Sequence, residues 1–142
     1  MSCGDKELAF VEQHPAAAMI TTTAGGVAKA VRIGLAVVDG RLWSSGTEDR
    51  VRTKRLRRDP RCTLFVFDAG YASLTLETTV TIIEGELAPA ESLRMFRITQ
   101  ERPEGPLSWF GGELDDERFL EVMREEKRLI YEFEVTRSYG LF

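Results

Sequence analysis

The sequence predicts a single domain, covering residues 1–142, built around an antiparallel β-barrel in the mainly β or α+β class. Short segments of alternating apolar and polar residues, which are typical of half-buried strands, recur along the chain. Turn signals at Gly25-Gly26 and at Asp39-Gly40 join such segments as tight hairpins. No glycine fingerprint follows the first strand, and strands do not alternate regularly with helices, so a parallel nucleotide-binding sheet is disfavoured.

The elements follow in chain order from this pattern. Strands are expected at residues 17–23, 27–38, 42–45, 62–68, 73–86 and 128–135, the first three forming an antiparallel meander. Helices are expected at residues 8–13, 50–58 and 89–102, and a further helix opens at Asp115. The helix at 50–58 ends before Pro60, because proline disfavours helical backbone in the residue before it. A loop rich in proline and glycine spans residues 101–112 and carries Trp109 and Phe110.

Composition excludes several classes of protein and site. Two cysteines, Cys3 and Cys62, make neither a disulfide framework nor a zinc site, and a single histidine, His14, excludes any multi-histidine metal centre. No apolar run reaches the roughly 18 to 20 residues of a membrane span. The N-terminal segment lacks the apolar region of a signal peptide, so we expect a cytoplasmic protein. We expect no metal, because the cysteines and the single histidine do not make a metal site.

The charge is distributed unevenly. Residues 50–61 hold seven arginine or lysine side chains and one aspartate, in a protein whose net charge is −4. Arginine predominates among the cations, and its planar guanidinium is well suited to phosphate and carboxylate. A concentrated basic stretch in an acidic protein favours a local anionic ligand over nucleic acid. The alternative is a solvated basic helix whose charges are balanced by acids elsewhere on the surface.

Hydroxyl and basic residues meet where the third predicted strand ends and the next helix begins. Residues 44–47 read Ser-Ser-Gly-Thr and are expected to form a polar loop, followed by Arg50, Arg52 and Lys54. Hydroxyls and free backbone N–H groups beside a helix start favour anion binding. Arg50 and Lys54 share a helix face because they are four residues apart. Arg32 lies on the neighbouring strand and reaches the same place if it faces the loop.

The segment WSSGTEDRVRTKRLRRDPRCTLFVFD resembles the strand-loop-helix-strand segment of the pyridoxamine 5′-phosphate oxidase-like split β-barrel flavoproteins. More narrowly, it resembles their coenzyme F-420 (deazaflavin)-dependent oxidoreductase branch, with Arg50 on the first basic position and Arg52 on the usual lysine. The likeness continues through GYASLTLETTVTIIEG and KRLIYEFEVTRSYG, so it spans nearly the whole chain. Arg32 matches a phosphate-contacting arginine of the flavin mononucleotide (FMN) branch, which leaves the choice of cofactor open.

The resemblance implies a six-stranded antiparallel split β-barrel with peripheral helices, of the FMN-binding type. It implies a homodimer whose interface holds coenzyme F-420, or alternatively FMN, with no nucleic acid or membrane as partner. The cofactor-binding residues implied in this way are Val31, Arg32, Ile33, Ser44, Ser45, Gly46, Thr47, Arg50, Arg52 and Lys54. Trp109 and Phe110 would roof the substrate side, or alternatively anchor their loop. Trp43 is interpreted as core or interface packing.

The function implied is hydride transfer from a deazaflavin to an electron-poor small molecule, such as an activated double bond or a quinone. No side chain stands out as the general acid. The alternatives are an FMN-binding oxidoreductase of the same family and a non-catalytic cofactor-binding or sensing module. The sequence shows no pyridoxal-phosphate recognition set near Tyr139-Gly140, so pyridoxamine phosphate oxidase activity itself is not expected.

Overall fold

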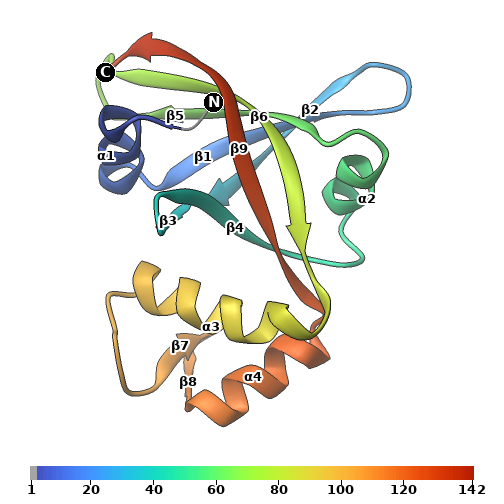
Figure 1. The fold of residues 1–142 in the computed structure, drawn as a ribbon, viewed down its shortest axis with the longest axis vertical. Helices are drawn as coiled ribbons and strands as arrows, with labels where there is room; N and C mark the ends of the chain where they lie inside the picture. Colours follow the sequence, from blue (N-terminus) through green and yellow to red (C-terminus); the bar gives the residue numbers. More distant parts are fainter. Residues whose placement is uncertain (1–2) are drawn as a thin grey trace.

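The computed structural model describes residues 3–142 and shows an antiparallel sheet that curls into a half-barrel (Figure 1). The strands of this sheet are β1 (Ala16–Thr22), β2 (Ala28–Gly34), β3 (Ala36–Val38), β4 (Arg41–Thr47), β5 (Arg61–Phe67), β6 (Ser73–Ile83) and β9 (Arg128–Leu141). They are paired in the order β2-β1-β5-β6-β9-β4-β3, and every pair is antiparallel. The predicted split-barrel α+β class is therefore confirmed, although the strand count is higher than six.

The predicted strand at residues 27–38 is two strands, because the chain breaks at Leu35. The Leu35 N–H donates to the Pro15 carbonyl at 2.6 Å, and the leucine side chain is buried. In consequence β2 pairs with β1 while β3 pairs with β4, so both hairpins of the predicted meander form, but its middle strand is interrupted. The Ser44 hydroxyl donates to the Gly34 carbonyl at 2.7 Å and thereby joins β4 to the end of β2.

A small helical lobe is inserted between β6 and β9 and lies below the barrel in Figure 1. It contains the short 3-10 turn η1 (Gly85–Leu87), α3 (Ala88–Thr99), the hairpin of β7 (Leu107–Trp109) and β8 (Gly112–Leu114), and α4 (Asp116–Glu125). The predicted loop at residues 101–112 thus contains strand β7 and the start of β8. The predicted helix at Asp115 is confirmed, since its carboxylate caps α4 by accepting from the Arg118 N–H at 2.8 Å.

Two further helices flank the barrel. Helix α1 (Asp5–Gln13) packs Phe10 and Val11 onto the barrel core, and α2 (Val51–Arg58) follows β4. Both end just before a proline, as predicted. None of the helices in residues 3–142 combines the length and the apolar composition that a membrane crossing requires.

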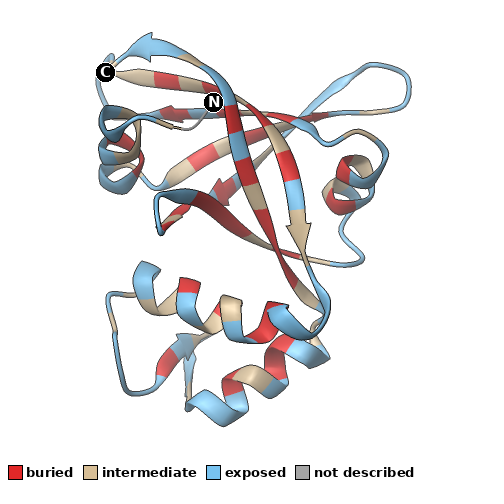
Figure 2. Ribbon diagram, in the orientation of Figure 1, coloured by how far each residue is buried: buried red, intermediate tan, exposed pale blue. Residues whose placement is uncertain are grey.

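The barrel core is filled by alternate residues of its strands (Figure 2). On β6 the residues of one face are buried. One face of β9 is buried in the same way, where Leu129, Tyr131, Phe133 and Val135 are each at most 4% exposed. This confirms the period-two patterns of the two strands. Burying each such side chain stabilises the fold by about 1.5–3 kcal/mol. A second cluster, formed by Ala36, Val38, Trp43, Met95 and Ile130, joins the barrel to α3.

Candidate active site

A cavity of about 720 Å³ lies between the barrel and α3. Its polar side is formed by Arg32 on β2, Ser44 and Ser45 on β4, and Arg52 in the first turn of α2. Three more polar residues line it near α1 and the end of α3, namely Glu12, Thr99 and Glu101. Its apolar side is formed by residues of β2, β3 and α3 and by one indole, namely Ile33, Leu35, Ala36, Val37, Trp43, Met95, Phe96 and Ile98. Five of the residues that the sequence assigned to a cofactor therefore meet at one cavity: Arg32, Ile33, Ser44, Ser45 and Arg52.

Two buried polar atoms of this lining have no partner. Within residues 3–142, Ser45 Oγ, Arg52 Nε and Ser92 Oγ are the buried side-chain polar atoms that lack a hydrogen bond, and Ser45 and Arg52 both line the cavity. A buried group left unsatisfied costs about 1–3 kcal/mol, and a charged one costs more. An arginine and a serine that line one cavity are matched by an anionic acceptor. The donor set of the cavity therefore fits a phosphate or carboxylate group.

Arg52 is held in place by contacts that involve Thr53 and Tyr131. The Thr53 hydroxyl donates to the Thr47 carbonyl at 2.7 Å and shares a short hydrogen bond with the phenol of Tyr131, so the first turn of α2 is fastened to β4 and β9. The Arg52 guanidinium carbon lies 5.8 Å from the centroid of the Tyr131 ring, within cation–π range. Gly46 permits this arrangement, because a Cβ atom there would overlap the Tyr131 side chain.

The expectation that residues 44–47 form a polar loop is wrong. They are the last four residues of β4 and pair in register with β9, from Ser44 opposite Tyr131 to Thr47 opposite Arg128. The loop is confined to residues 48–50. Ser44 is buried and its hydroxyl donates to the Gly34 carbonyl, so the hydroxyl without a partner is that of Ser45.

Other predicted ligands lie outside this cavity. Arg50 and Lys54 are exposed, and Thr47 donates its hydroxyl to Asp49 at 2.8 Å. That hydrogen bond, together with the charges of Arg50 and Lys54, lowers the pKa of Asp49 below its usual range. An ionised carboxylate thus accompanies these cations. Gly46 is buried and does not line the cavity, and Val31 packs partly against the barrel core and lines a different hollow beside β1, β2 and the end of β5.

Trp109 and Phe110 do not line the cavity either. Trp109 packs in the lobe, where its indole N–H donates to Glu126 at 3.0 Å and its ring meets Phe96 edge to face at 5.1 Å. Phe110 is 85% exposed at the tip of the β7–β8 hairpin. Trp109 therefore anchors its segment, which is the second of the two predicted roles.

The α3 wall was missed by sequence reasoning. Met95, Phe96 and Ile98 lie on the helix predicted at residues 89–102, but an apolar stripe has the same pattern whether it fills a core or lines a cavity. Trp43 was predicted to pack in the core or at an interface. It is buried and also lines the cavity.

Comparison with solved structures supports the fold. A conserved hypothetical protein of Mycobacterium tuberculosis matches with a TM-score of 0.73 at 22% identity, over 99% of this chain and 86% of that one. A Listeria innocua protein provisionally described as a pyridoxamine 5′-phosphate oxidase gives a TM-score of 0.68 at 17% identity, over 96% of both chains. A protein described as an F-420 reductase gives a TM-score of 0.68 at 18% identity, over 96% of this chain and 98% of that one.

Sequence comparison assigns the family. A search of curated proteins finds no match. The family model described as pyridoxamine 5′-phosphate oxidase matches residues 4–128, which is most of the chain and includes every residue on the polar side of the cavity. The chain therefore belongs to the pyridoxamine 5′-phosphate oxidase-like family of flavin-binding oxidoreductases.

Proposed function

We propose that this protein is a coenzyme F-420-dependent oxidoreductase that reduces electron-poor small molecules. The observation that carries the proposal is the pair of unpartnered donors, Ser45 Oγ and Arg52 Nε, at the polar side of a cavity with an apolar opposite wall. A planar ring with an anionic arm has this same division between apolar and charged parts. The F-420 reductase among the structural neighbours adds support for the deazaflavin.

In this proposal the residues of the cavity bind and orient the cofactor. Arg52 and Ser45 donate to the anionic arm, Tyr131 and Thr53 hold Arg52 in place, and the α3 residues Met95 and Phe96 keep water from the apolar wall. The exposed Arg50 and Lys54 attract the anion from solution without touching it inside the cavity. When bound, a deazaflavin supplies hydride-transfer chemistry, which suits activated double bonds and quinones.

FMN is the second candidate cofactor, and Arg32 is the observation that favours it. Arg32 on β2 and Arg52 on α2 both line the cavity, so it is lined by two guanidinium-bearing residues from two elements. Two arginines match a compact terminal phosphate, whose charge approaches −2 at neutral pH, better than a singly charged diester.

We propose further that the protein is a homodimer, with the outer face of the sheet as its interface. Five residues on neighbouring strands lie side by side in one row across the sheet. In order they are Arg32, Ala18, Phe65, Thr75 and Tyr139. Phe67, stacked on Phe65 at 5.4 Å, is 55% exposed on the same face. Exposed aromatic groups of this kind mark association surfaces. Since Arg32 belongs both to this row and to the cavity, a second copy seated here would border the site.

We also propose that the protein works in the cytoplasm. Both cysteines are free, Cys62 being buried and Cys3 half-buried, as expected in a reducing compartment.

The test is a fluorescence titration of the protein with coenzyme F-420 and, separately, with FMN, at two salt concentrations. We expect Arg52→Ala to weaken binding about tenfold to a hundredfold, because it removes a charge-assisted hydrogen bond. Arg57→Ala is the matched control, since Arg57 lies on the same helix but pairs with Glu84 at 2.8 Å outside the cavity. Equal losses in both variants would reduce the effect to net charge, and binding of neither cofactor would refute the proposal.

A second measurement separates an enzyme from a carrier. Consumption of the reduced cofactor is followed with menadione as a quinone acceptor. Turnover supports the oxidoreductase, whereas tight binding with no consumption for menadione or for an activated alkene would leave the non-catalytic module as the better description.

A further inference from the structure

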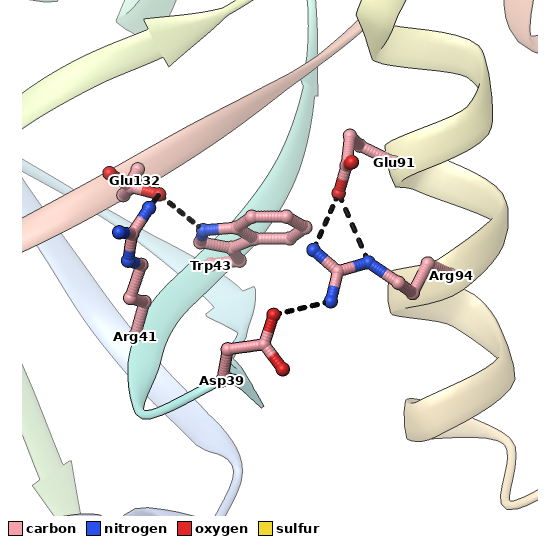
Figure 3. A network of polar contacts seen from close by, with 6 residues as sticks. All are labelled: Asp39, Arg41, Trp43, Glu91, Arg94 and Glu132. Carbon is pink, nitrogen blue, oxygen red and sulfur yellow. Dashed lines mark hydrogen bonds and ion pairs between the residues drawn. The ribbon is translucent and has the colours of Figure 1, made fainter.

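Trp43, the one aromatic side chain that β4 contributes to the cavity wall, is held from two sides (Figure 3). Its indole N–H donates to Glu132 Oε2 on β9 at 2.8 Å. The guanidinium carbon of Arg94 lies 5.2 Å from the centroid of its ring, within cation–π range. Trp43 itself is 3% exposed. Trp43 is therefore in contact with Arg94, a residue of the helical lobe that does not line the cavity.

Arg94 joins the lobe to the barrel by an ion pair. Its Nη1 lies 2.6 Å from Asp39 Oδ2, in the turn between β3 and β4, and its Nη2 lies 2.8 Å from Glu91 of its own helix. These two carboxylates raise the pKa of Arg94 and keep it charged. The next residue along the helix, Met95, is buried in the cavity wall. The ion pair with Asp39 therefore joins the two elements, α3 and the β3–β4 hairpin, that supply Met95 and Trp43 to the cavity wall.

We propose that Arg94 is a positioning residue that sets the width of the cavity by fastening α3 to Asp39 while stacking on Trp43. The inference rests on the proposed function only in that the cavity is taken to hold the planar cofactor. A planar ring between two walls gains dispersion energy only if both walls are at contact distance, and a gap of less than 1 Å forfeits a large part of it. Arg94 thus acts on affinity through the wall, without touching the ligand.

The chain offers a closely matched control in Arg118. Like Arg94, it lies on a lobe helix, is about half exposed (48% against 44%) and pairs with two carboxylates, one of them three residues away. Both partners of Arg118, Glu121 and Glu125, lie on its own helix α4, so it fastens nothing to the barrel. Arg94→Ala and Arg118→Ala therefore remove the same kind of side chain, and only the first releases the wall.

The first measurement needs no ligand. Hydrogen–deuterium exchange is followed in peptides that cover α3 and the β3–β4 hairpin, with acrylamide quenching of tryptophan emission as a second readout. For Arg94→Ala we expect about threefold to tenfold faster exchange in both segments and greater quenching, from the loss of one cross-element ion pair and one cation–π contact. Arg118→Ala leaves the β3–β4 hairpin unchanged. Identical exchange in the wild type and in Arg94→Ala would overturn the proposal.

The second measurement is the Kd of whichever cofactor the wild type binds. Arg94→Ala is expected to weaken binding about threefold to tenfold. Asp39→Asn keeps the turn, because asparagine tolerates the positive φ of 53° at this position, and should reproduce most of the effect. The double variant should then be no worse than Arg94→Ala. Arg94→Lys keeps the charge but not the planar stacking, so it should restore exchange more fully than affinity.

The two proposals fail in different ways. If the wild type binds neither cofactor, the proposed function falls, and the ligand-free exchange still decides whether Arg94 fastens the wall. If the wild type binds a cofactor and Arg94→Ala loosens α3 without changing Kd, the positioning role is refuted while the proposed function stands.

Discussion

The phenol of Tyr131 shares a short hydrogen bond with the hydroxyl of Thr53, and this contact fastens the basic helix α2 to the centre of the barrel. Tyr131 is fully buried on β9, and Thr53 also donates to the Thr47 carbonyl. Arg52 stacks over the same ring. The polar side of the cavity therefore depends on a residue that lies 78 positions from Thr53 in the chain.

Tyr131→Phe should test this relationship. The variant keeps the ring under Arg52 but leaves the buried Thr53 hydroxyl with one partner instead of two, so we expect a loss of about 1 kcal/mol in the free energy of unfolding. Urea unfolding followed by circular dichroism measures it. Because the ring remains, cofactor affinity should fall less than in Arg52→Ala. An unchanged midpoint would show that the hydroxyl contributes nothing to stability.

Gly46→Ala should be among the most damaging conservative substitutions in the barrel. A Cβ atom at this buried position of β4 overlaps the Tyr131 side chain, which is packed on all sides and has no room to move. Overpacking of this kind costs about 1–3 kcal/mol. Gly34→Ala is the control, because a Cβ there meets nothing within 4 Å. Thermal melts of the two variants should differ clearly, and similar melting temperatures would contradict the packing argument.

Ser45→Ala should separate binding from stability. The Ser45 hydroxyl is buried without a partner, so its removal is expected to leave the unfolding free energy unchanged or raise it by up to about 1 kcal/mol. In the same variant, affinity for the cofactor should fall, because the cavity loses one of its free polar atoms.

Ser92→Ala is the matched comparison for this variant. Ser92 is the other buried serine without a partner in residues 3–142, but it lies on α3 and does not line the cavity. It should show the same stability effect with unchanged Kd. Equal affinities for Ser45→Ala and the wild type would remove Ser45 from the site.

Sequence patterns predicted those parts of the fold that depend on local burial. Alternation on β6 and β9 identified their buried faces, because a strand with one face in the core must repeat every two residues. The end of α2 before Pro60 was predictable for an equally local reason.

Features set by distant contacts were not predictable in this way. The break at Leu35 depends on a hydrogen bond to Pro15, and the strand conformation of residues 44–47 depends on pairing with β9. The site shows the same division. The basic and hydroxyl residues marked its polar side, and Arg32, Ser45 and Arg52 do meet at the cavity. Its α3 wall and the ion pair between Asp39 and Arg94 follow only from the way the lobe docks on the barrel.

We expect the protein to lose stability at alkaline pH because of the buried thiol of Cys62. Burial raises the pKa of its thiol from 9.0 to about 12 in the folded protein, outweighing hydrogen bonds that favour the thiolate. A folded pKa above the unfolded one means that the native state holds its proton longer. The thiol's contribution is therefore complete below about pH 9 and is lost as the pH rises towards about 12.

Urea unfolding of the wild type and of Cys62→Ala between about pH 8 and about pH 11 measures this contribution. The alanine variant is expected to be less stable at the lower pH, because it leaves a small cavity in the barrel core. The difference between the two proteins should then narrow as the pH rises, since only the wild type must keep a thiol protonated against the solvent. A difference that stays constant over this range would show that the Cys62 thiol titrates alike in the folded and unfolded chains.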